Sequence, residues 1–402
     1  MGMDKRFEFK VLNLACDVAE SLLKNGSEIY RVENCVCRIA TRYGFKGQCF
    51  ATLTCIIITI ESENGEITSL VRRVNSRGIN LDKVYKLSRL MDELDCCDMD
   101  SIDLKVKEIN SEQPYSTLVN MAGHSIGASF FSILFLGGMN DFLASLFAGL
   151  FIGCASKLMN RFNIGVFFSN LICGFVATAV ACFFIYTGFI DSVSITIISS
   201  LMILVPGVAF INSMRDIFSG DLVTGMSRLL EVLMVGTSIA VGSGIALNIF
   251  FKIGGVDIYF HNIFVQIFAA IMTSFGFGIM FNIRGKNLFH TGIAGGISWF
   301  VYLIGTKADF SIGVVYFLAT FFLALYSEII ARKIKTTVTA ILIPALIPLA
   351  PGGGIYYTMY NLIEKNYPMA LEKGITTFII AGSMAIGIFA VANIMRVVDR
   401  TK

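Results

Sequence analysis

Five ionisable residues follow one Pro-Gly pair in a part of the chain that is otherwise strongly apolar. They are Arg215, Asp216, Asp221, Arg228 and Glu231, and Asn212 lies just before them. A guanidinium binds a carboxylate through two parallel hydrogen bonds, and an Asp carboxylate binds an ammonium group. A Glu in an apolar helix is desolvated, so its neutral form becomes accessible and it can exchange protons. Together these residue types predict contacts with a small polar solute and with a proton.

The depth of Glu231 sets it apart from the other four. If the helix that carries it starts at residue 222, Glu231 lies about 13 Å along the helix axis. Arg228 precedes it by three residues, so both side chains project from one helical face. Ionisable groups at such depth in a membrane are costly and tend to mark solute or ion pathways. The alternative is a salt-bridged loop at the membrane interface with one Arg–Glu pair.

Two Pro-Gly pairs interrupt apolar segments that would otherwise be helical. Pro206-Gly207 and Pro351-Gly352 each fall about two-thirds along their segments, which hold four of the six prolines. Proline breaks a helix because it lacks an N–H group and clashes with the preceding turn. Two broken helices that face each other would offer free carbonyls and half-helix N-termini to a charged solute. Simple packing kinks are the alternative.

The two breaks belong to segments that recur at a fixed offset of 145 residues. Residues 201–249 match residues 346–394 at 10 of 49 positions without a gap. The best stretch pairs Leu204-Val205-Pro206-Gly207 with Leu349-Ala350-Pro351-Gly352. Because five spans per copy is an odd number, the second copy would sit upside down in the bilayer, as in many secondary transporters.

Charge and hydropathy divide the chain near Pro114. Residues 1–116 hold 34 charged side chains, whereas residues 117–402 hold 27. A helix needs about 20 apolar residues to cross a bilayer, and the segments that qualify are 117–136, 139–157, 163–187, 193–213, 222–249, 257–281, 287–305, 309–331, 336–357 and 373–396. We therefore predict a polytopic α-helical membrane protein with ten transmembrane helices in a 5+5 inverted repeat. A small α+β cytoplasmic domain (1–116) would precede the two repeats, 117–255 and 256–402.

The distribution of Lys and Arg between the loops predicts the orientation in the lipid bilayer. Positive charges near span ends are kept on the cytoplasmic side, and no secretory signal opens the chain. With the N-terminus inside, the inner loops carry most of the basic residues, among them Lys157, Arg161, Lys286 and Arg332. Both termini are therefore expected in the cytoplasm. Glu328 lies within one helical turn of Arg332 and is expected to pair with it.

The first 116 residues predict two helices, two strands and then further helices. Apolar residues recur at helical spacing over 7–24, Gly26 ends that helix, and Ser27 is a candidate N-cap for the next. Residues 49–60 are rich in β-branched side chains and predict a buried strand. A turn then leads into a partner strand at 67–74.

Two polar strings stand out in this domain, and they are Gly26-Ser27-Glu28-Ile29-Tyr30-Arg31-Val32-Glu33 and Arg72-Arg73-Val74-Asn75-Ser76-Arg77-Gly78-Ile79-Asn80. Glu28 lies three residues before Arg31 and therefore on the same helical face. The three Arg of the second string could grip a carboxylate or a phosphate. They could instead pair with Glu28 and Glu33 and fasten a strand to a helix, which is the more usual role of Arg beside a turn.

The sequence predicts no cofactor and no metal site. Seven of the ten cysteines precede residue 117, where reducing surroundings favour free thiols. None shows the paired C-x-x-C spacing of a zinc site, and the chain has only three His. No nucleophile–base pair or nucleotide-binding loop specifies a reaction. We therefore expect neither an enzyme nor a nucleic-acid partner.

The two polar strings, together with Leu204-Val205-Pro206-Gly207, resemble the threonine/serine exporter family. The resemblance covers essentially the whole chain, with a soluble-looking N-terminal domain followed by ten spans. In relatives the same material is divided over two polypeptides, and a cut near residue 255 would reproduce that division. The family implies proton-driven export of threonine and serine across the bacterial inner membrane. The divided relatives imply export of a dicarboxylate such as succinate.

The resemblance and the residue types together lead to a specific expectation. An exporter working by alternating access would hold a small amino acid near the two breaks. Arg228 would attract its carboxylate, Asp216 or Asp221 its ammonium, and Glu231 would exchange the coupling proton. A succinate exporter is one alternative, and a membrane-anchored sensor or enzyme with its active element in the N-terminal domain is another. The oligomeric state is left open, with a homo-oligomer among the options.

Overall fold

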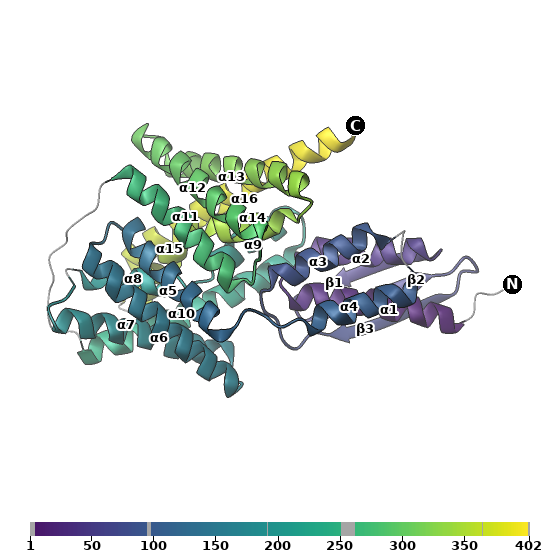
Figure 1. The fold of residues 1–402 in the computed structure, drawn as a ribbon, viewed down its shortest axis with the longest axis horizontal. Coiled ribbons are helices and arrows are strands. Elements are labelled where there is room, and N and C mark those ends of the chain that lie inside the picture. The colour runs from purple at the N-terminus through teal and green to yellow at the C-terminus, as the bar shows by residue number, and fades with distance from the viewer. Residues whose placement is uncertain (1–4, 95–97, 191, 251–261, 364, 401–402) are drawn as a thin grey trace. The chain divides into compact units, whose positions relative to one another are not determined.

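The computed structural model describes residues 5–94, 98–190, 192–250, 262–363 and 365–400, and these are mostly helical (Figure 1). Contacts divide the chain into two compact units. Unit 1 comprises Met1–Pro114, Phe281–Ile283 and Lys335–Ala340, and unit 2 comprises Tyr115–Met280, Arg284–Ile334 and Ile341–Lys402. The predicted boundary between the two repeats, at 255/256, lies outside the described residues.

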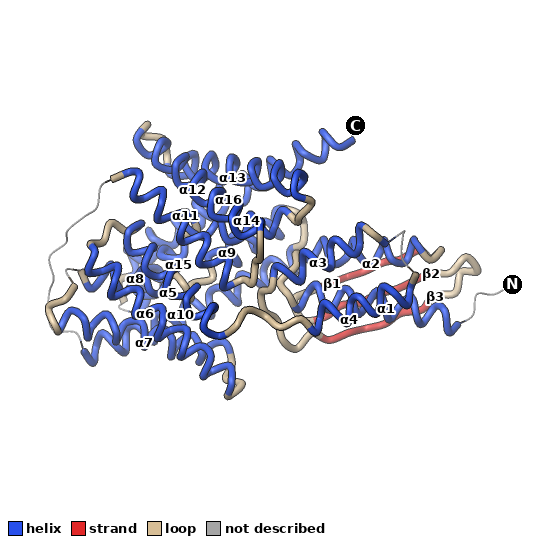
Figure 2. Tube along the Cα trace, in the orientation of Figure 1, coloured by secondary structure: helices blue, strands red, loops and turns tan. Residues whose placement is uncertain are grey.

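Unit 1 combines helices with an antiparallel sheet. Its elements are α1 (Lys5–Lys24), α2 (Ile29–Arg42), β1 (Lys46–Ala51), β2 (Cys55–Glu61), β3 (Ile67–Arg73), α3 (Leu81–Asp92) and α4 (Met99–Ser111). Among the described residues the strands pair in the order β1-β2-β3, drawn in red in Figure 2. Helix α1 packs on β2 and β3, and α2 packs on β1. Alternate residues of β2, namely Ile56, Ile58 and Ile60, are buried in the resulting core.

Two local predictions for unit 1 are wrong. The single strand predicted at 49–60 is two strands, because the Cys55 N–H donates to Thr52 Oγ1 at 3.2 Å and closes a tight connection between β1 and β2. Helix α2 has Glu28 rather than Ser27 as its N-cap, since its first helical residue is Ile29. Helix α1 and strand β3 lie where the sequence predicts them.

Unit 2 is helical throughout its described part. It begins with α5 (Thr117–Leu134), α6 (Met139–Arg161), α7 (Val166–Tyr186), α8 (Val193–Leu201), α9 (Gly207–Phe218) and α10 (Leu222–Phe250). It continues with α11 (Ile263–Met280), α12 (Lys286–Lys307), α13 (Ile312–Ile334), α14 (Val338–Leu346), the 3-10 helix η2 (Ile347–Leu349), α15 (Gly352–Ile363) and α16 (Tyr367–Arg400). The first three residues of α14 belong to unit 1. The chain is thus a polytopic helical membrane protein.

Fewer spans are evident than the ten predicted. Among the described residues, seven helices are long and apolar enough to cross a membrane, or eight if the bent pair around Pro351 counts as one span. Helix α5 carries polar residues such as Asn120 and His124 along its 18 residues, which lowers its hydropathy. Helices α8 and α9 are 9 and 12 residues long, so each alone is too short to span.

The helix boundaries of unit 2 follow the 145-residue offset of the sequence. Helices α8 and α14 begin at Val193 and Val338, and α9 and α15 begin at Gly207 and Gly352. Neighbouring helices follow the same offset, since α7 packs on α10 and α13 packs on α16. Both the helix starts and these two helix pairs therefore recur at the 145-residue offset.

Matched glycines allow equivalent helix pairs to approach closely. A Cβ on Gly242 of α10 would clash with the carbonyl oxygen of Leu171 in α7. A Cβ on Gly387 of α16, 145 residues later, would lie 2.8 Å from the carbonyl oxygen of Phe317 in α13. Small residues let the backbones of membrane helices touch. Both interfaces therefore depend on the absence of a side chain at the same place.

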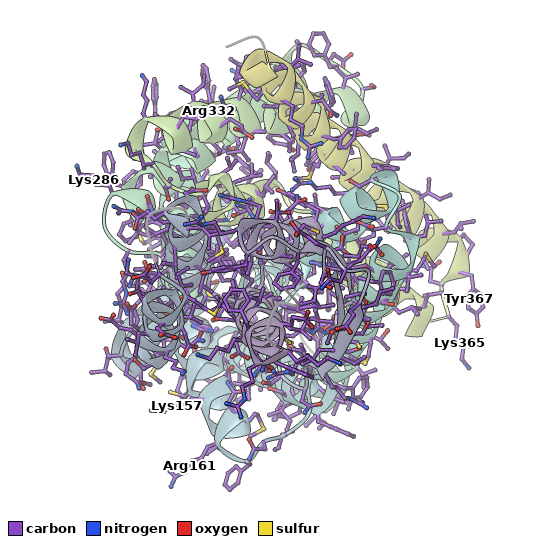
Figure 3. All side chains as sticks on the ribbon, turned by 90° about the vertical axis from the view of Figure 1, so that its right-hand side faces the viewer. Lys157, Arg161, Lys286, Arg332, Lys365 and Tyr367 are labelled. Atoms are coloured by element: carbon purple, nitrogen blue, oxygen red, sulfur yellow. The ribbon has the colours of Figure 1, made fainter. Side chains whose placement is uncertain are left out.

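Basic side chains that the sequence assigns to the cytoplasmic side lie at exposed helix ends. Lys157, Arg161 and Lys286 extend outward at the periphery of the view in Figure 3. The expected pair of Glu328 with Arg332 is confirmed by a distance of 3.6 Å between Oε2 and a guanidinium nitrogen. The orientation relative to the two faces of the membrane stays a prediction.

Candidate functional site

Both Pro-Gly pairs lie where a helix is interrupted, and the backbone forms the same turn at each. The Gly207 N–H donates to the Val205 carbonyl at 2.9 Å, and the Gly352 N–H donates to the Ala350 carbonyl at 2.7 Å. This hydrogen bond closes a three-residue turn with Pro at its centre. Pro206 has φ −81° and ψ 49°, which fits such a turn. The helical segments on either side of the second break differ in direction by 49°.

The two breaks contact each other. A Cβ on Gly207 would lie 2.7 Å from the Cβ of Ala350, and a Cβ on Gly352 would lie 3.0 Å from Cγ1 of Val205. Val205 and Ala350 are also 145 residues apart, so each break offers its glycine to the same position of the other. Such reciprocity is the pattern of an isologous interface.

Asp216 and Arg228 form an ion pair that joins α9 to α10. Arg228 Nε lies 3.3 Å from Asp216 Oδ2, and the two side chains are 17% and 14% exposed, respectively. Their attraction is weakly screened because both are largely removed from water. Leaving either charge unpaired in this setting would be costly. From the sequence, the two residues are expected to bind opposite ends of the solute, whereas the structure pairs them directly.

The other predicted pathway residues lie on the same hairpin. Asn212 is half-buried on α9, one turn before Asp216, and Glu231 is half-buried on α10, one turn after Arg228. Asp221 lies between the helices, where its N–H donates to the Asp216 carbonyl at 2.9 Å. The structure therefore brings Asp216 and Arg228 into contact, while Asp221 helps to form the turn that lets them meet.

Hydroxyl groups connect α10 with α15 further along the hairpin. Ser243 Oγ lies 3.2 Å from Tyr356 Oη and 2.7 Å from Thr178 Oγ1. Thr237 Oγ1 also lies 3.4 Å from Met359 Sδ. The contacts with Tyr356 and Met359 join the first part of unit 2 to the second, whereas Thr178 lies on α7 within the first part. The sequence does not predict these contacts, because Ser, Thr and Tyr are common in apolar helices and no spacing reveals their partners.

A fully buried carboxylate, that of Asp141, is not predicted from the sequence. Its Oδ2 accepts from the Gly138 N–H at 3.0 Å, and its Oδ1 accepts from the Thr196 hydroxyl at 3.1 Å and the Ser192 N–H at 3.4 Å. These donors belong to the starts of α6 and α8, so one carboxylate holds two helix N-termini together. An acidic residue at the third helical position after a cap was the available signal.

In unit 1, the two polar strings meet through their backbones. The Gly78 N–H donates to the Lys24 carbonyl at 2.9 Å, and the Asn80 N–H donates to the Asn25 carbonyl at 3.0 Å. Gly26 has φ +88°, and a Cβ there would lie 3.1 Å from the Gly78 carbonyl oxygen. Glycine tolerates both conditions because it lacks a side chain. The turn that ends α1 is thereby fastened to the segment that leads into α3.

The charged residues of the first string hold α2 in place. Glu28 and Arg31 pair at 3.1 Å, as their spacing predicts. Burial alone would lower the pKa of Arg31, but the neighbouring Glu28 and Tyr30 raise it above its ordinary value. Glu33 Oε1 accepts from the Ala51 N–H at 2.9 Å, which ties α2 to β1.

Arg72 of the second string fastens β3 to α1. Its guanidinium lies 3.3 Å from Asp17 Oδ1 and 3.0 Å from Glu20 Oε2, so its partners are on α1 rather than on α2. Arg73 and Arg77 are exposed. Among the described residues, no group of three or more His, Cys, Asp or Glu side chains is close enough to hold a metal ion.

Comparisons with known families cover almost the whole chain. A family described as a threonine/serine exporter matches residues 13–250, which is more than half of the chain. The chain belongs to the threonine/serine exporter family. A second family, described as threonine/serine exporter ThrE, matches residues 266–394 of this chain. The family is one of membrane exporters rather than enzymes.

Individual relatives share only 21% to 26% sequence identity with this chain. The "Probable succinate transporter subunit YjjP" of Klebsiella aerogenes is 26% identical over 247 residues, covering 60% of this chain and 95% of the relative. The "Probable threonine/serine exporter" of Mycobacterium tuberculosis is 21% identical, covering 96% of this chain and 76% of the relative. The "Threonine/serine exporter" of Corynebacterium glutamicum is 21% identical, covering 94% and 81%. No solved structure matches this chain significantly.

Proposed function

We propose that this protein exports threonine and serine in exchange for protons, by alternating access between two inverted repeats of five spans. The observation that carries the proposal is the reciprocal contact of the breaks, with Gly207 against Ala350 and Gly352 against Val205. A two-fold axis relating two copies of one motif produces such a contact. Ten spans follow if α5 crosses the membrane and if α8–α9 and α14–α15 each count as one broken span.

Packing between the proposed repeats is reciprocal as well. Helix α10 packs on α15, and its counterpart α16 packs on α9. The matched first helices, α5 and α11, pack on each other. An odd number of spans in each repeat gives them opposite orientations. Rocking of one repeat against the other would then open the site to each side of the membrane in turn.

The ion pair suits a substrate that carries two opposite charges. The carboxylate of an amino acid would replace Asp216 at Arg228, while its ammonium would take the place of Arg228 at Asp216. Neither protein charge is left unpaired during this exchange, which avoids the cost of an isolated buried ion. The N-termini of α9 and α15, which begin at the breaks, would add positive potential for the carboxylate. Glu231, one turn further along α10, would exchange the coupling proton.

Charge favours an amino acid over a dicarboxylate at this site. The α9–α10 hairpin carries Arg215 and Arg228 against Asp216, Asp221 and Glu231, a formal excess of one negative charge. Such a site repels a dianion but not a zwitterion, which has no net charge. Succinate is the second candidate because the Klebsiella relative is named as a succinate transporter subunit.

Liposomes that contain the purified protein and labelled L-threonine test the proposal. Acidifying the outside should accelerate threonine efflux, because entering protons drive the amino acid out, and external succinate should have no effect. Liposomes with the Arg228→Gln variant are the control for leak. Movement of succinate without threonine would reject the substrate, and movement of neither would favour the sensor or enzyme alternative.

A further inference from the structure

Unit 1 contains a cavity of about 430 Å³ that the proposed transport path does not use. Its charged lining residues are Asp17, Glu20 and Lys24 of α1, Lys83 of α3, and Asp103 and Lys107 of α4. Small-molecule sites are concave and begin at about this size. The cavity is unusual among such sites because ionisable side chains from three helices surround it.

The lining carries both signs of charge in equal number. Lys24 Nζ lies 2.6 Å from Glu20 Oε1, and Lys107 Nζ lies 2.6 Å from Asp103 Oδ2. Burial raises the pKa of Asp17 above its ordinary value even though Arg72 opposes the shift, so an added cation near this carboxylate would be favourable. A wall with both charges suits a ligand that also carries both, and it offers little net attraction to a simple anion or cation.

Neutral polar groups fix the shape of the cavity. Ser21 Oγ donates to Asn110 Oδ1 at 2.5 Å, and Lys83 Nζ donates to the Asn110 carbonyl at 2.6 Å. Asn25 Nδ2 donates to the Ser21 carbonyl at 2.7 Å. These bonds connect α1, α3 and α4 across the cavity. The hydroxyl and amide groups in them can also accept or donate to a small polar ligand.

The second polar string of unit 1 holds in place residues that line the cavity. The carbonyl groups of Lys24 and Asn25 accept from the N–H groups of Gly78 and Asn80. Asn80 Oδ1 then accepts from the Lys83 N–H at 3.1 Å and caps α3. The cap thus holds the turn that carries Lys83 beside the end of α1. The second string thus supports the lining residues Lys24, Asn25 and Lys83 without lining the cavity itself.

We propose that this cavity binds a small neutral amino acid as its zwitterion. The ammonium group contacts Asp17 and Asp103, the carboxylate contacts Lys83, and a side-chain hydroxyl meets the Ser21–Asn110 pair. The inference deepens the proposed function and rests on it for the identity of the ligand, which is the transported amino acid. Occupancy of the cavity would report the concentration of substrate to the exporter.

Hydrogen–deuterium exchange of the full-length protein in lipid nanodiscs tests the proposal, with L-threonine and succinate as probes. We expect L-threonine, and not succinate, to slow exchange in segments 17–25, 83–90 and 103–110. Asp103→Asn should weaken this protection by about tenfold in threonine concentration, since a charge-assisted hydrogen bond is lost. The matched control is Asp100→Asn, an exposed Asp one turn earlier on α4, which should leave the protection unchanged.

The proposal and the transport function can fail separately. Protection that survives Arg228→Gln but weakens in Asp103→Asn supports the cavity as a site distinct from the membrane path. Absence of protection at saturating L-threonine, or equal protection by succinate, overturns the cavity proposal even if liposomes export threonine. Protection in a protein that moves no threonine rejects the exporter and leaves the cavity as an amino-acid site.

Discussion

The two interrupted helices of unit 2 share a backbone but differ in charge. The helices around the breaks begin 145 residues apart, and both breaks contain the same Pro-centred turn. At the places of Asp216 and Arg228, however, the second copy has Asn361 and Lys373. Lys373 is exposed, whereas Arg228 is largely buried in its ion pair. The helix starts and the turn recur at the second break, and the charged pair of Asp216 and Arg228 does not.

The polar side chains of the second copy bond within their own helices. Asn361 Nδ2 donates to the Tyr357 carbonyl at 2.7 Å. Thr376, at the place of Glu231, donates to the Glu372 carbonyl at 2.9 Å. The first copy instead joins two helices through charged side chains. This difference fits a transporter in which the similar helices around both breaks move, while the charged pair beside the first break binds the charges of the solute.

Removing the cation of the first copy should have the largest effect. Arg228→Gln leaves Asp216 without its partner, and breaking a buried pair costs about 3–5 kcal/mol. We therefore expect at least about a hundredfold loss in the initial rate of gradient-driven threonine efflux. Circular dichroism during heating would show whether the variant still folds.

The matched variant in the second copy is Lys373→Gln, which should change the rate by less than about twofold, because exposed charges contribute little. Asp216→Asn combined with Arg228→Gln reproduces the uncharged character of the second copy. That double variant should fold like the wild type and still fail to transport. Equal activity of Arg228→Gln and Lys373→Gln would remove any functional meaning from the charge asymmetry.

A methyl group at the first break should have the next largest effect. Gly207→Ala places a Cβ 2.7 Å from the Cβ of Ala350, and overpacking of this kind costs about 1–3 kcal/mol. We expect roughly a tenfold loss of threonine efflux. Adding Ala350→Gly removes the opposing methyl and should restore most of the rate. Gly244→Ala is the control, because a Cβ there meets no atom within 4 Å.

Rescue is the decisive part of this experiment. A double variant no better than Gly207→Ala would show that the contact between the breaks does not limit transport. The turns at Pro206 and Pro351 would then act as simple packing kinks.

Local chemistry explains which features could be predicted from the sequence. The break at Pro206 was predictable because proline removes a hydrogen-bond donor wherever it stands. The helix at 7–24 was predictable from its apolar period. The division of the strand predicted at 49–60 was not, because it depends on hydrogen bonds between Thr52 and Cys55, while the β-branched residues continue beyond them.

The ion-pair partners in the candidate site could not be predicted from the sequence, for a different reason. Arg228 and Glu231 share a helical face by spacing alone, but the pairing of Arg228 with Asp216 depends on how the turn near Asp221 folds α9 back on α10. Asp141 was overlooked for the same reason, since two of its donors come from α8, about 50 residues away. Local rules find breaks and caps, whereas tertiary packing chooses ion pairs.

Neutralising Glu231 should separate coupling from movement of the substrate. In Glu231→Gln we expect efflux to lose its acceleration by external acid, while exchange of labelled for unlabelled threonine continues. A neutral amide of the same size can pack at this position but cannot carry a proton. Thr376→Val, at the matched position, should keep both activities. Retained acceleration in Glu231→Gln would move the search for the proton carrier to another carboxylate, with Asp141 next.

The smallest effect is expected from a methyl group at the second break. In Gly352→Ala the new Cβ would lie 3.0 Å from Cγ1 of Val205 and 3.2 Å from Sδ of Met202. Met is a flexible side chain that can adjust by a few tenths of an ångström, so we expect a loss of about two- to threefold in threonine efflux. At Gly207, by contrast, the opposing methyl of Ala350 is fixed to the backbone. Equal losses at the two glycines would mean that the breaks work as one symmetric unit, and that the charge pair beside the first break does not make it the more sensitive one.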